Sequence, residues 1–290
     1  MTIRSFPYTQ TDVAARARTE NFTVASRVLP RPVRGHLQAF YAYARLVDEI
    51  GDAYEGDRRA ALDEVEEQTR AALVDPSSRD VWPIVADGAR SVSELGADPA
   101  ALFDLIAANR QDQSIFEYAT FDDLLAYCAL SANPVGRLVL AAFGASGDDT
   151  ARSSDSLCTG LQLAEHWQDV AEDAAAGRIY VPKDDLERFG VDPAALTAGP
   201  PASRAFRALM VFEVSRARRF LDGGQPLIDA LHGTARWAVA GFWGGGHAAL
   251  DAIAARRFDV LAGTPRASRA RALTRAVSAL IRPTTRQETA

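Results

Sequence analysis

Residues 37–57 read LQAFYAYARLVDEIGDAYEGD, and this stretch decides the fold class. Leu37 and Tyr41 begin a stripe at helical spacing. Steps of three and four residues carry that stripe on to Asp48 and Asp52. Because an amphipathic helix buries such a stripe, the two carboxylates are expected at the interior end of a core-facing helix.

The charge pattern of this helix is repeated in a second segment, residues 158–173, which reads CTGLQLAEHWQDVAED. Between Arg45 and Arg58 there are five acids and no base, and the same is true between Arg152 and Arg178. A solvated helix face normally mixes signs, because like charges one turn apart repel. A solvated face explains either segment alone, but two such segments favour a bound cation.

The second segment has two distinct faces. One is polar and contains Cys158, Gln162, Glu165, Asp169, Glu172 and Asp173. The other is apolar and contains Leu163, Trp167 and Val170. The segment therefore predicts a helix that packs on one side and presents carboxylates on the other.

The ligand types indicate which cation is expected. Only His166, of four histidines, lies in either segment, so carboxylates without His or Cys clusters favour Mg²⁺ or Mn²⁺ over zinc. Mg²⁺ usually bridges a few carboxylates to substrate phosphates. Two acidic helices in a bundle thus predict a diphosphate–metal clamp, with Arg45 and Arg178 at phosphate oxygens. The sequence has no GxxxxGK[ST] loop, which disfavours nucleotide hydrolysis.

The composition of the whole chain excludes several classes of protein. Its 290 residues are 48% hydrophobic and 24% charged, which is typical of a globular protein. A net charge of −6 argues against a nucleic-acid partner. Cys128 and Cys158 are too few for a disulfide framework, and residues 1–10 contain no secretory signal, so a cytoplasmic protein is expected. The apolar run within residues 235–254 is too short for a membrane span and predicts a buried helix.

Strand signals are almost absent, and helical periodicity dominates. One all-α domain is expected over residues 1–290, with a core of about 15–262 and a C-terminal helix and tail at 263–290. The predicted helices are residues 9–29, 33–55, 57–74, 80–95, 98–113, 121–145, 152–176, 201–221, 225–258 and 266–282.

Several ordered motifs resemble those of squalene and phytoene synthases. Residues 41–52 resemble the first Asp-rich motif of that family, residues 162–173 the second, and residues 177–182 its GRxYxP segment. Shorter likenesses cover residues 20–30 and 127–137. The resemblance implies an all-α bundle of the isoprenoid (terpenoid) synthase type with a central active-site cavity.

Details of the motifs are similar to the bacterial hydroxysqualene synthase branch of hopanoid and squalene pathways. Residues 165–169 read EHWQD, where presqualene diphosphate and phytoene synthases usually carry Asn-Ile-x-x-Arg-Asp. Glu165 stands where many relatives have Asn, and no aromatic residue follows Cys128 directly. Both departures argue against direct condensation of two farnesyl diphosphates.

The resemblance implies a Mg²⁺-dependent reaction, with several ions bridging to the diphosphate of a prenyl substrate. In the reaction that the resemblance implies, presqualene diphosphate is ionised, and water captures the cation to give hydroxysqualene. The sequence has no GxGxxG motif after a strand, so no nicotinamide site is expected. The alternatives are a head-to-head farnesyl diphosphate condensing enzyme and a catalytically silent pathway partner.

Site residues are carried over by position in the motifs. The metal-binding and catalytic set is Asp48, Asp52, Asp169 and Asp173, with Glu165 as a further metal ligand. The substrate-binding set is Asn21, Phe22, Ser26, Tyr41, Arg45, Asn133, Gln162, Glu165, Arg178 and Tyr180. Candidate liners of an apolar cation pocket are Phe22, Phe40, Leu138, Trp167, Phe212, Trp237 and Phe242, with core packing as the alternative for each.

Some residues keep a second interpretation. An ion pair with Glu49 is the alternative for Arg45, and packing is the alternative for Tyr180. His166 is interpreted as structural. Residues 266–286 carry six arginines among Ala, Leu and Val, which fits either a solvated helix or peripheral contact with the anionic inner face of the membrane. Oligomeric state and contact with pathway enzymes stay open.

Overall fold

The computed structural model describes residues 29–281, and residues 1–28 and 282–290 lie outside the description. The described residues form helices and no strand, with one isolated parallel bridge between Glu117 and Ile179. The all-α prediction is therefore confirmed. The chain divides into two compact units. Unit 1 holds residues up to Ile115 together with Ala129–Gly147, and unit 2 holds Phe116–Cys128 together with residues from Asp148 onward.

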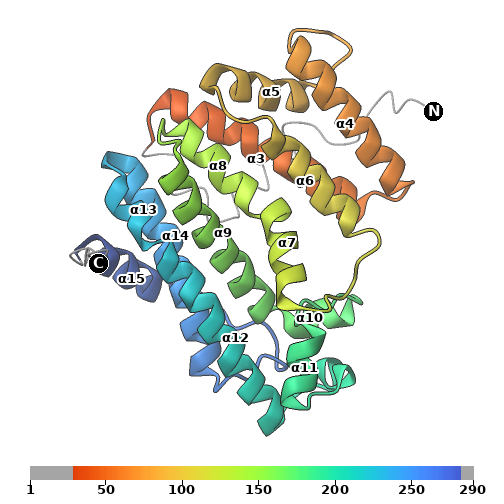
Figure 1. Cartoon of the computed structure of the whole chain (residues 1–290), viewed down its shortest axis with the longest axis vertical. Coiled ribbons are helices and arrows are strands. Elements are labelled where there is room, and N and C mark those ends of the chain that lie inside the picture. Colours follow the sequence, from red (N-terminus) through yellow and green to blue (C-terminus); the bar gives the residue numbers. More distant parts are fainter. Residues whose placement is uncertain (1–28, 282–290) are drawn as a thin grey trace. The chain divides into compact units, whose positions relative to one another are not determined.

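Unit 1 is built around one long helix. This helix, α3, packs against four others, α4, α5, α6 and α8 (Figure 1). Their bounds are α3 Arg31–Ala53, α4 Arg58–Val74, α5 Pro83–Leu95, α6 Ala100–Gln111 and α8 Asn133–Ala142.

The buried face of α3 differs from the stripe expected from the sequence. Its centre runs through Tyr43, Val47 and Ile50, each with no exposed surface. Asp48 is half-buried and Asp52 is exposed. The expectation that both carboxylates lie on the core face is thus wrong for Asp52, while Asp48 lies at the border of a core filled by Tyr43, Val47 and Ile50.

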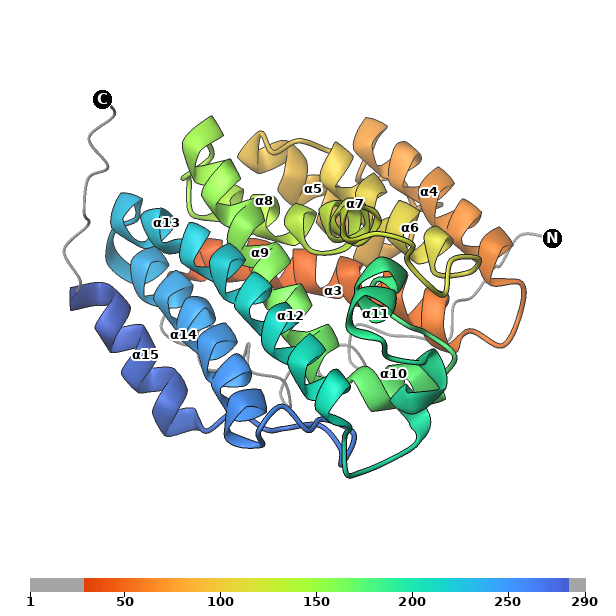
Figure 2. The ribbon, with the colours of Figure 1, turned by 60° about the horizontal axis from the view of Figure 1, so that its bottom comes forward.

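Unit 2 contains the first part of α7 (Phe121–Ser131) and the remaining helices. These are α9 Asp148–Gln168, α10 Val170–Ala175, α11 Lys183–Phe189, the 3₁₀ turn η1 Pro193–Thr197, α12 Arg204–Gly223, α13 Gln225–Ala230, α14 Gly233–Ala255 and α15 Arg269–Ile281. Figures 1 and 2 show α9, α12, α14 and α15 side by side. Leu163 and Trp167 are fully buried, which confirms the predicted apolar face of α9.

Three predicted helices are broken in the structure. The helix expected at 121–145 divides at Ala132 into α7 and α8, since Pro134 in the first turn of α8 has no N–H to donate to a helix that continues from α7. The helix expected at 152–176 breaks at Asp169, and the one expected at 225–258 breaks between α13 and α14. Helix α11 and the turn η1 were not expected, and the helix expected at 9–29 lies outside the described residues.

Within residues 29–281, one stretch has the length and hydropathy of a membrane span, Phe121–Ala142. Half of it is buried inside the structure, and it consists of α7 and α8. Half-buried core helices meet the same criteria, so this stretch alone does not indicate a span. Helix α14, the other apolar stretch, is largely buried, as expected.

Candidate active site

The carboxylate of Asp48 is held by a neighbouring helix of unit 1. The amide Nδ2 of Asn109, on α6, donates to Asp48 Oδ1 at 3.3 Å. Burial raises the pKa of Asp48 to about 6, with a further increase from the charge of Asp52, while the Asn109 hydrogen bond acts in the opposite direction. Asp48 therefore lies in a place where positive charge would stabilise its ionised form.

Helix α6 contacts α3 beside this carboxylate, where the side chain of Asn109 lies against Gly51. A Cβ on Gly51 would lie 2.0 Å from Asn109 Oδ1, so any larger residue here would displace the Asn109 side chain. Gln113 Nε2 donates to Gly51 O at 3.0 Å and to Asn109 O at 2.9 Å. These contacts fix the position of the amide that binds Asp48.

Arg45 lies one turn before Glu49 on α3. Its Nη2 is 3.7 Å from Glu49 Oε2, so the ion pair considered as an alternative is present. Its Nε is buried and has no hydrogen-bond partner among the described residues. A buried guanidinium N–H without an acceptor is costly, and a phosphate oxygen would satisfy it.

Of the other predicted substrate-binding residues before α9, the structure describes two and leaves three outside. Tyr41 is half-buried on α3, and Asn133 is buried at the start of α8. Asn21, Phe22 and Ser26 lie outside the described residues.

In unit 2 the second acidic segment surrounds the break between α9 and α10. Asp169 is the residue at that break, and Asp173 N donates to its carbonyl oxygen at 2.8 Å. Burial raises the pKa of Asp173 to about 7, and the negative charges of Asp169 and Glu165 raise it further. The acids of this segment therefore repel one another, as expected from the charge pattern.

A loop distant in sequence contacts the same acids. Thr264, between α14 and α15, places its Oγ1 2.7 Å from Asp169 Oδ1 and 2.7 Å from Glu172 Oε1. Next to it, Gln168 Nε2 donates to the carbonyl oxygen of Pro265. Sequence reasoning missed Thr264, because no local spacing connects it to the acidic motif.

The segment of residues 177–182 is fixed by backbone hydrogen bonds. Ile179 N donates to Phe116 O at 2.7 Å, and Arg178 N donates to Asp173 O at 2.8 Å. These bonds hold Arg178 and Tyr180 beside the second acidic segment.

Tyr180 stacks on His166. Their ring centroids are 3.7 Å apart with an interplanar angle of 14°. Burial lowers the pKa of His166 to about 3, so the imidazole is neutral, and Gln162 Nε2 lies 3.1 Å from its Nε2. A small hollow in unit 2 is lined by His166, Asp173 and Tyr180, among others. The structure thus brings three predicted residues, Gln162, Asp173 and Tyr180, around a histidine that was interpreted as structural.

The predicted pocket liners are only partly consistent with the structure. Phe40, Leu138 and Trp167 are buried. Trp237 is 64% exposed on α14, so its prediction as a liner is wrong. The helical period alone did not show that its side of α14 faces outward.

The donor chemistry of these residues fits Mg²⁺. Among residues 29–281, no three His, Cys, Asp or Glu side chains are gathered as a metal-binding group. Mg²⁺ commonly takes only one or two carboxylates and completes its shell with water and substrate phosphate. Asp48 with Asp52, and Asp169 with Asp173, are oxygen donors whose mutual repulsion a divalent cation would relieve.

The described chain is helical, and solved structures with terpenoid-synthase-type helical folds superpose on it, so the chain has a fold of this class. The profile of the family "Squalene/phytoene synthase" matches residues 15–274, and the chain belongs to this family. Proteins of this family bind prenyl diphosphates.

The names of similar proteins give two different activities, hydroxysqualene synthase and phytoene synthase. A hydroxysqualene synthase of Rhodopseudomonas palustris is 34% identical and covers 72% of this chain and 70% of its own length. A phytoene synthase of Mycobacterium bovis is 33% identical, covering 77% of this chain and 74% of its own.

Solved structures support the same fold. The crystal structure of squalene synthase HpnC from Alicyclobacillus acidocaldarius has a TM-score of 0.79 at 37% identity. The match covers 86% of this chain and 94% of that one. A dehydrosqualene synthase in complex with ligand has a TM-score of 0.83 at 21% identity, and it supports the fold alone.

Proposed function

We propose that this chain is a Mg²⁺-dependent hydroxysqualene synthase. It ionises presqualene diphosphate, and water captures the rearranged cation to give hydroxysqualene and diphosphate. The observation that carries the proposal is the occurrence of two acidic segments, around Asp48 and around Asp173, in which burial and neighbouring acids raise the pKa of each carboxyl group although Arg45 and Arg178 act against the shift. The choice of reaction is supported by the Trp167-Gln168-Asp169 form of the second motif and by the hydroxysqualene synthase relatives.

The residues of the chain have separate tasks in this reaction. Asp48 and Asp52 in unit 1, and Asp169 and Asp173 in unit 2, would bind Mg²⁺ ions, with Glu165 as a further ligand in unit 2. When bound, Mg²⁺ neutralises the negative charge that develops on the departing diphosphate. Arg45 would donate to a diphosphate oxygen through its Nε, which has no acceptor within residues 29–281.

Residues beside the second motif would orient the substrate. Arg178 and Tyr180 are fixed by the backbone bonds of their segment, so their side chains start from a defined place. Gln162 keeps the neutral His166 in position behind Tyr180. Because His166 is neutral and buried, it adds no positive charge near the acids.

A head-to-head condensing enzyme is the second candidate. The observation in its favour is the 33% identity to phytoene synthase of Mycobacterium bovis, which nearly equals the identity to the hydroxysqualene synthase. Such an enzyme joins two farnesyl groups rather than ionising a preformed C30 diphosphate.

The test supplies purified protein and Mg²⁺ with presqualene diphosphate or with farnesyl diphosphate alone. We expect hydroxysqualene from the first and no product from the second. Turnover of farnesyl diphosphate alone would establish the second candidate instead.

Variants separate an enzyme from a silent pathway partner. Asp48→Asn and Asp169→Asn are expected to abolish product formation, while Asp148→Asn, an exposed acid at the start of α9, leaves it unchanged. Unchanged product formation in both active-site variants would support the silent role.

A further inference from the structure

Helix α15 presents an apolar ridge to solvent. Leu273, Val277 and Ile281 follow one another at four-residue spacing, so their side chains lie on one face of the helix. Their exposed fractions are 65%, 39% and 73%. Large apolar side chains this exposed are rare elsewhere in the described chain, and three of them fall within 13 residues.

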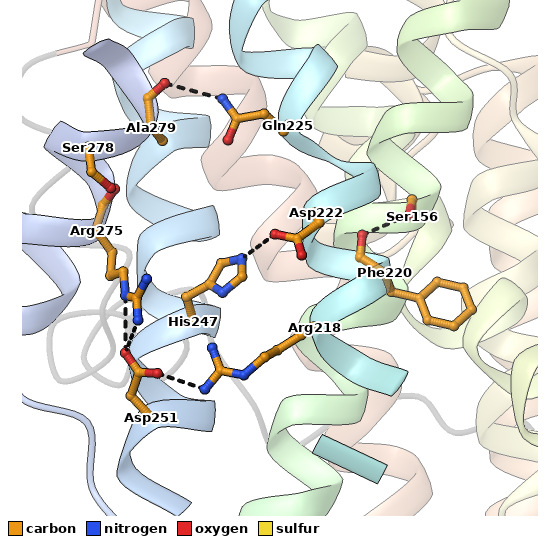
Figure 3. A network of polar contacts seen from close by, with 10 residues as sticks. All are labelled: Ser156, Arg218, Phe220, Asp222, Gln225, His247, Asp251, Arg275, Ser278 and Ala279. Carbon is orange, nitrogen blue, oxygen red and sulfur yellow. Dashed lines mark hydrogen bonds and ion pairs between the residues drawn. The ribbon is translucent and has the colours of Figure 1, made fainter. Parts of the chain in front are cut away.

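The opposite face of α15 is firmly docked on α14. A Cβ on Gly244 would lie 2.6 Å from both Ala272 O and Ala276 N, so the two backbones are in close contact. Arg275 Nη2 also donates to Asp251 at 2.8 Å (Figure 3). The ridge is therefore held outward by a fixed helix and does not result from an undocked one.

A second anchor lies near the end of α15. Gln225 Nε2 donates to Ala279 O at 3.2 Å, and Arg236 Nη2 donates to Leu280 O at 3.1 Å. Trp237 follows Arg236 on α14 and is 64% exposed. An exposed indole thus lies on the helix turn that contacts the last turn of α15.

Arginines flank the ridge on both sides. Arg269 lies one turn before Leu273 on the same face, and Arg271 lies on the far side of the ridge; both are exposed. From Val260 to Ile281 the chain has four arginines and no acid, although the net charge of the whole chain is −6. The surface of α15 is therefore positively charged in a protein that is otherwise acidic.

We propose that α15 docks this protein on the surface of an anionic bilayer. Apolar side chains along one line, with arginines beside them and an exposed indole at the end, form the pattern of a helix lying in the plane of a membrane interface. A symmetric contact with a second copy would bring the arginines of two α15 helices together, so the charge of the surface favours anionic lipid headgroups. The proposal stands on α15 and does not depend on the reaction.

The test uses the full-length protein and sucrose-loaded vesicles, without substrate. Vesicles of phosphatidylglycerol and phosphatidylcholine are expected to sediment with the protein, and vesicles of phosphatidylcholine alone are expected to bind it far less. Trp237 fluorescence should shift to shorter wavelength on binding, and Trp237→Phe should remove that shift.

Variants of the ridge and of its flanks are tested separately. Leu273→Ser with Ile281→Ser should weaken vesicle binding about tenfold or more, since each exposed apolar side chain contributes to partition. Arg269→Gln with Arg271→Gln should weaken binding about tenfold, and only to anionic vesicles. The control is Val74→Ser on α4, which replaces another exposed apolar residue and should leave binding unchanged.

Three outcomes would overturn the proposal. The first is absence of binding to anionic vesicles. The second is equal binding by the ridge variant and the unmodified protein. The third is a loss of dimer in sedimentation of the ridge variant with no change in vesicle binding, which would assign the ridge to a second copy of the chain.

Discussion

The hydroxyl of Thr264 lies 2.7 Å from Oδ1 of Asp169, although 95 residues separate them in sequence. The loop that joins α14 to α15 thus contacts the acidic motif at the residue where α9 ends. The hydroxyl also lies 2.7 Å from Glu172 Oε1, and because it has one hydrogen it donates to one of the two carboxylates at a time. It has no charge, so it orients a carboxylate without neutralising it. We interpret Thr264 as a positioning residue for the second acidic segment.

Replacing Thr264 with Val should reduce turnover by roughly ten- to a hundredfold, because a hydrogen bond to a charged group contributes about 1.5–3 kcal/mol. The concentration of Mg²⁺ that gives half-maximal activity should rise as well. Thr264→Ser should restore most of the activity. Thr274→Val is the matched control, since Thr274 donates only to Ala270 O of its own helix. Equal loss in the Ser and Val variants would contradict the role of the hydroxyl.

The crossing of α3 and α6 offers a second prediction. Gly51→Ala should displace Asn109 from Asp48, because the new Cβ would lie 2.0 Å from Asn109 Oδ1. We expect a loss of about 1–3 kcal/mol in the free energy of unfolding, measured in urea, together with reduced activity. Gly35→Ala on the same helix meets no atom within 4 Å and should stabilise by about 0.5–1 kcal/mol. A similar effect of both changes would show that the crossing is not tightly packed.

Local patterns predicted much of this fold, and their failures have physical causes. Helical periodicity identified the core helices and the buried side of Trp167, because each face of a helix is encoded within a few turns. The breaks at Ala132 and Asp169 were missed, since the apolar pattern continues through them. Thr264 and Asn109 could not be predicted either, because their roles depend on contacts between segments distant in the chain.

Glu213 gives a prediction about pH. It is fully buried on α12, and burial, with a further contribution from the negative charge of Asp185, raises its pKa from 4.5 to about 8, although Arg216 opposes the shift. Between these values the folded protein holds a proton that the unfolded chain releases. The contribution of Glu213 to stability is therefore fully present below pH 4.5 and is lost as the pH rises to about 8.

Glu213→Gln should remove this part of the pH dependence. In urea unfolding, the free energy of unfolding of the variant should exceed that of the unmodified protein by more at pH 9 than at pH 5. Glu187→Gln, at an exposed position of α11, is the control and should change neither value. A gain that is the same at both pH values would contradict the raised pKa of Glu213.

Substitutions at two adjacent glycines of α14 test the contact of α15 with α14. Gly244→Ala should destabilise this contact by about 1–3 kcal/mol, since the Cβ would meet backbone atoms that cannot move independently. Gly245→Ala has no atom within 4 Å and should be neutral or stabilising. Hydrogen exchange of the backbone amides in α15 measures the effect of each substitution. Unchanged amide protection in Gly244→Ala would contradict the close contact between α14 and α15.

The central claim is that water captures the cation formed from presqualene diphosphate. Its most direct test is the incubation of purified protein with Mg²⁺ and presqualene diphosphate in ¹⁸O-labelled water, followed by mass spectrometry of the product. We predict hydroxysqualene that carries one ¹⁸O atom per molecule. Unlabelled hydroxysqualene, or conversion of presqualene diphosphate to a product other than hydroxysqualene, would contradict the account.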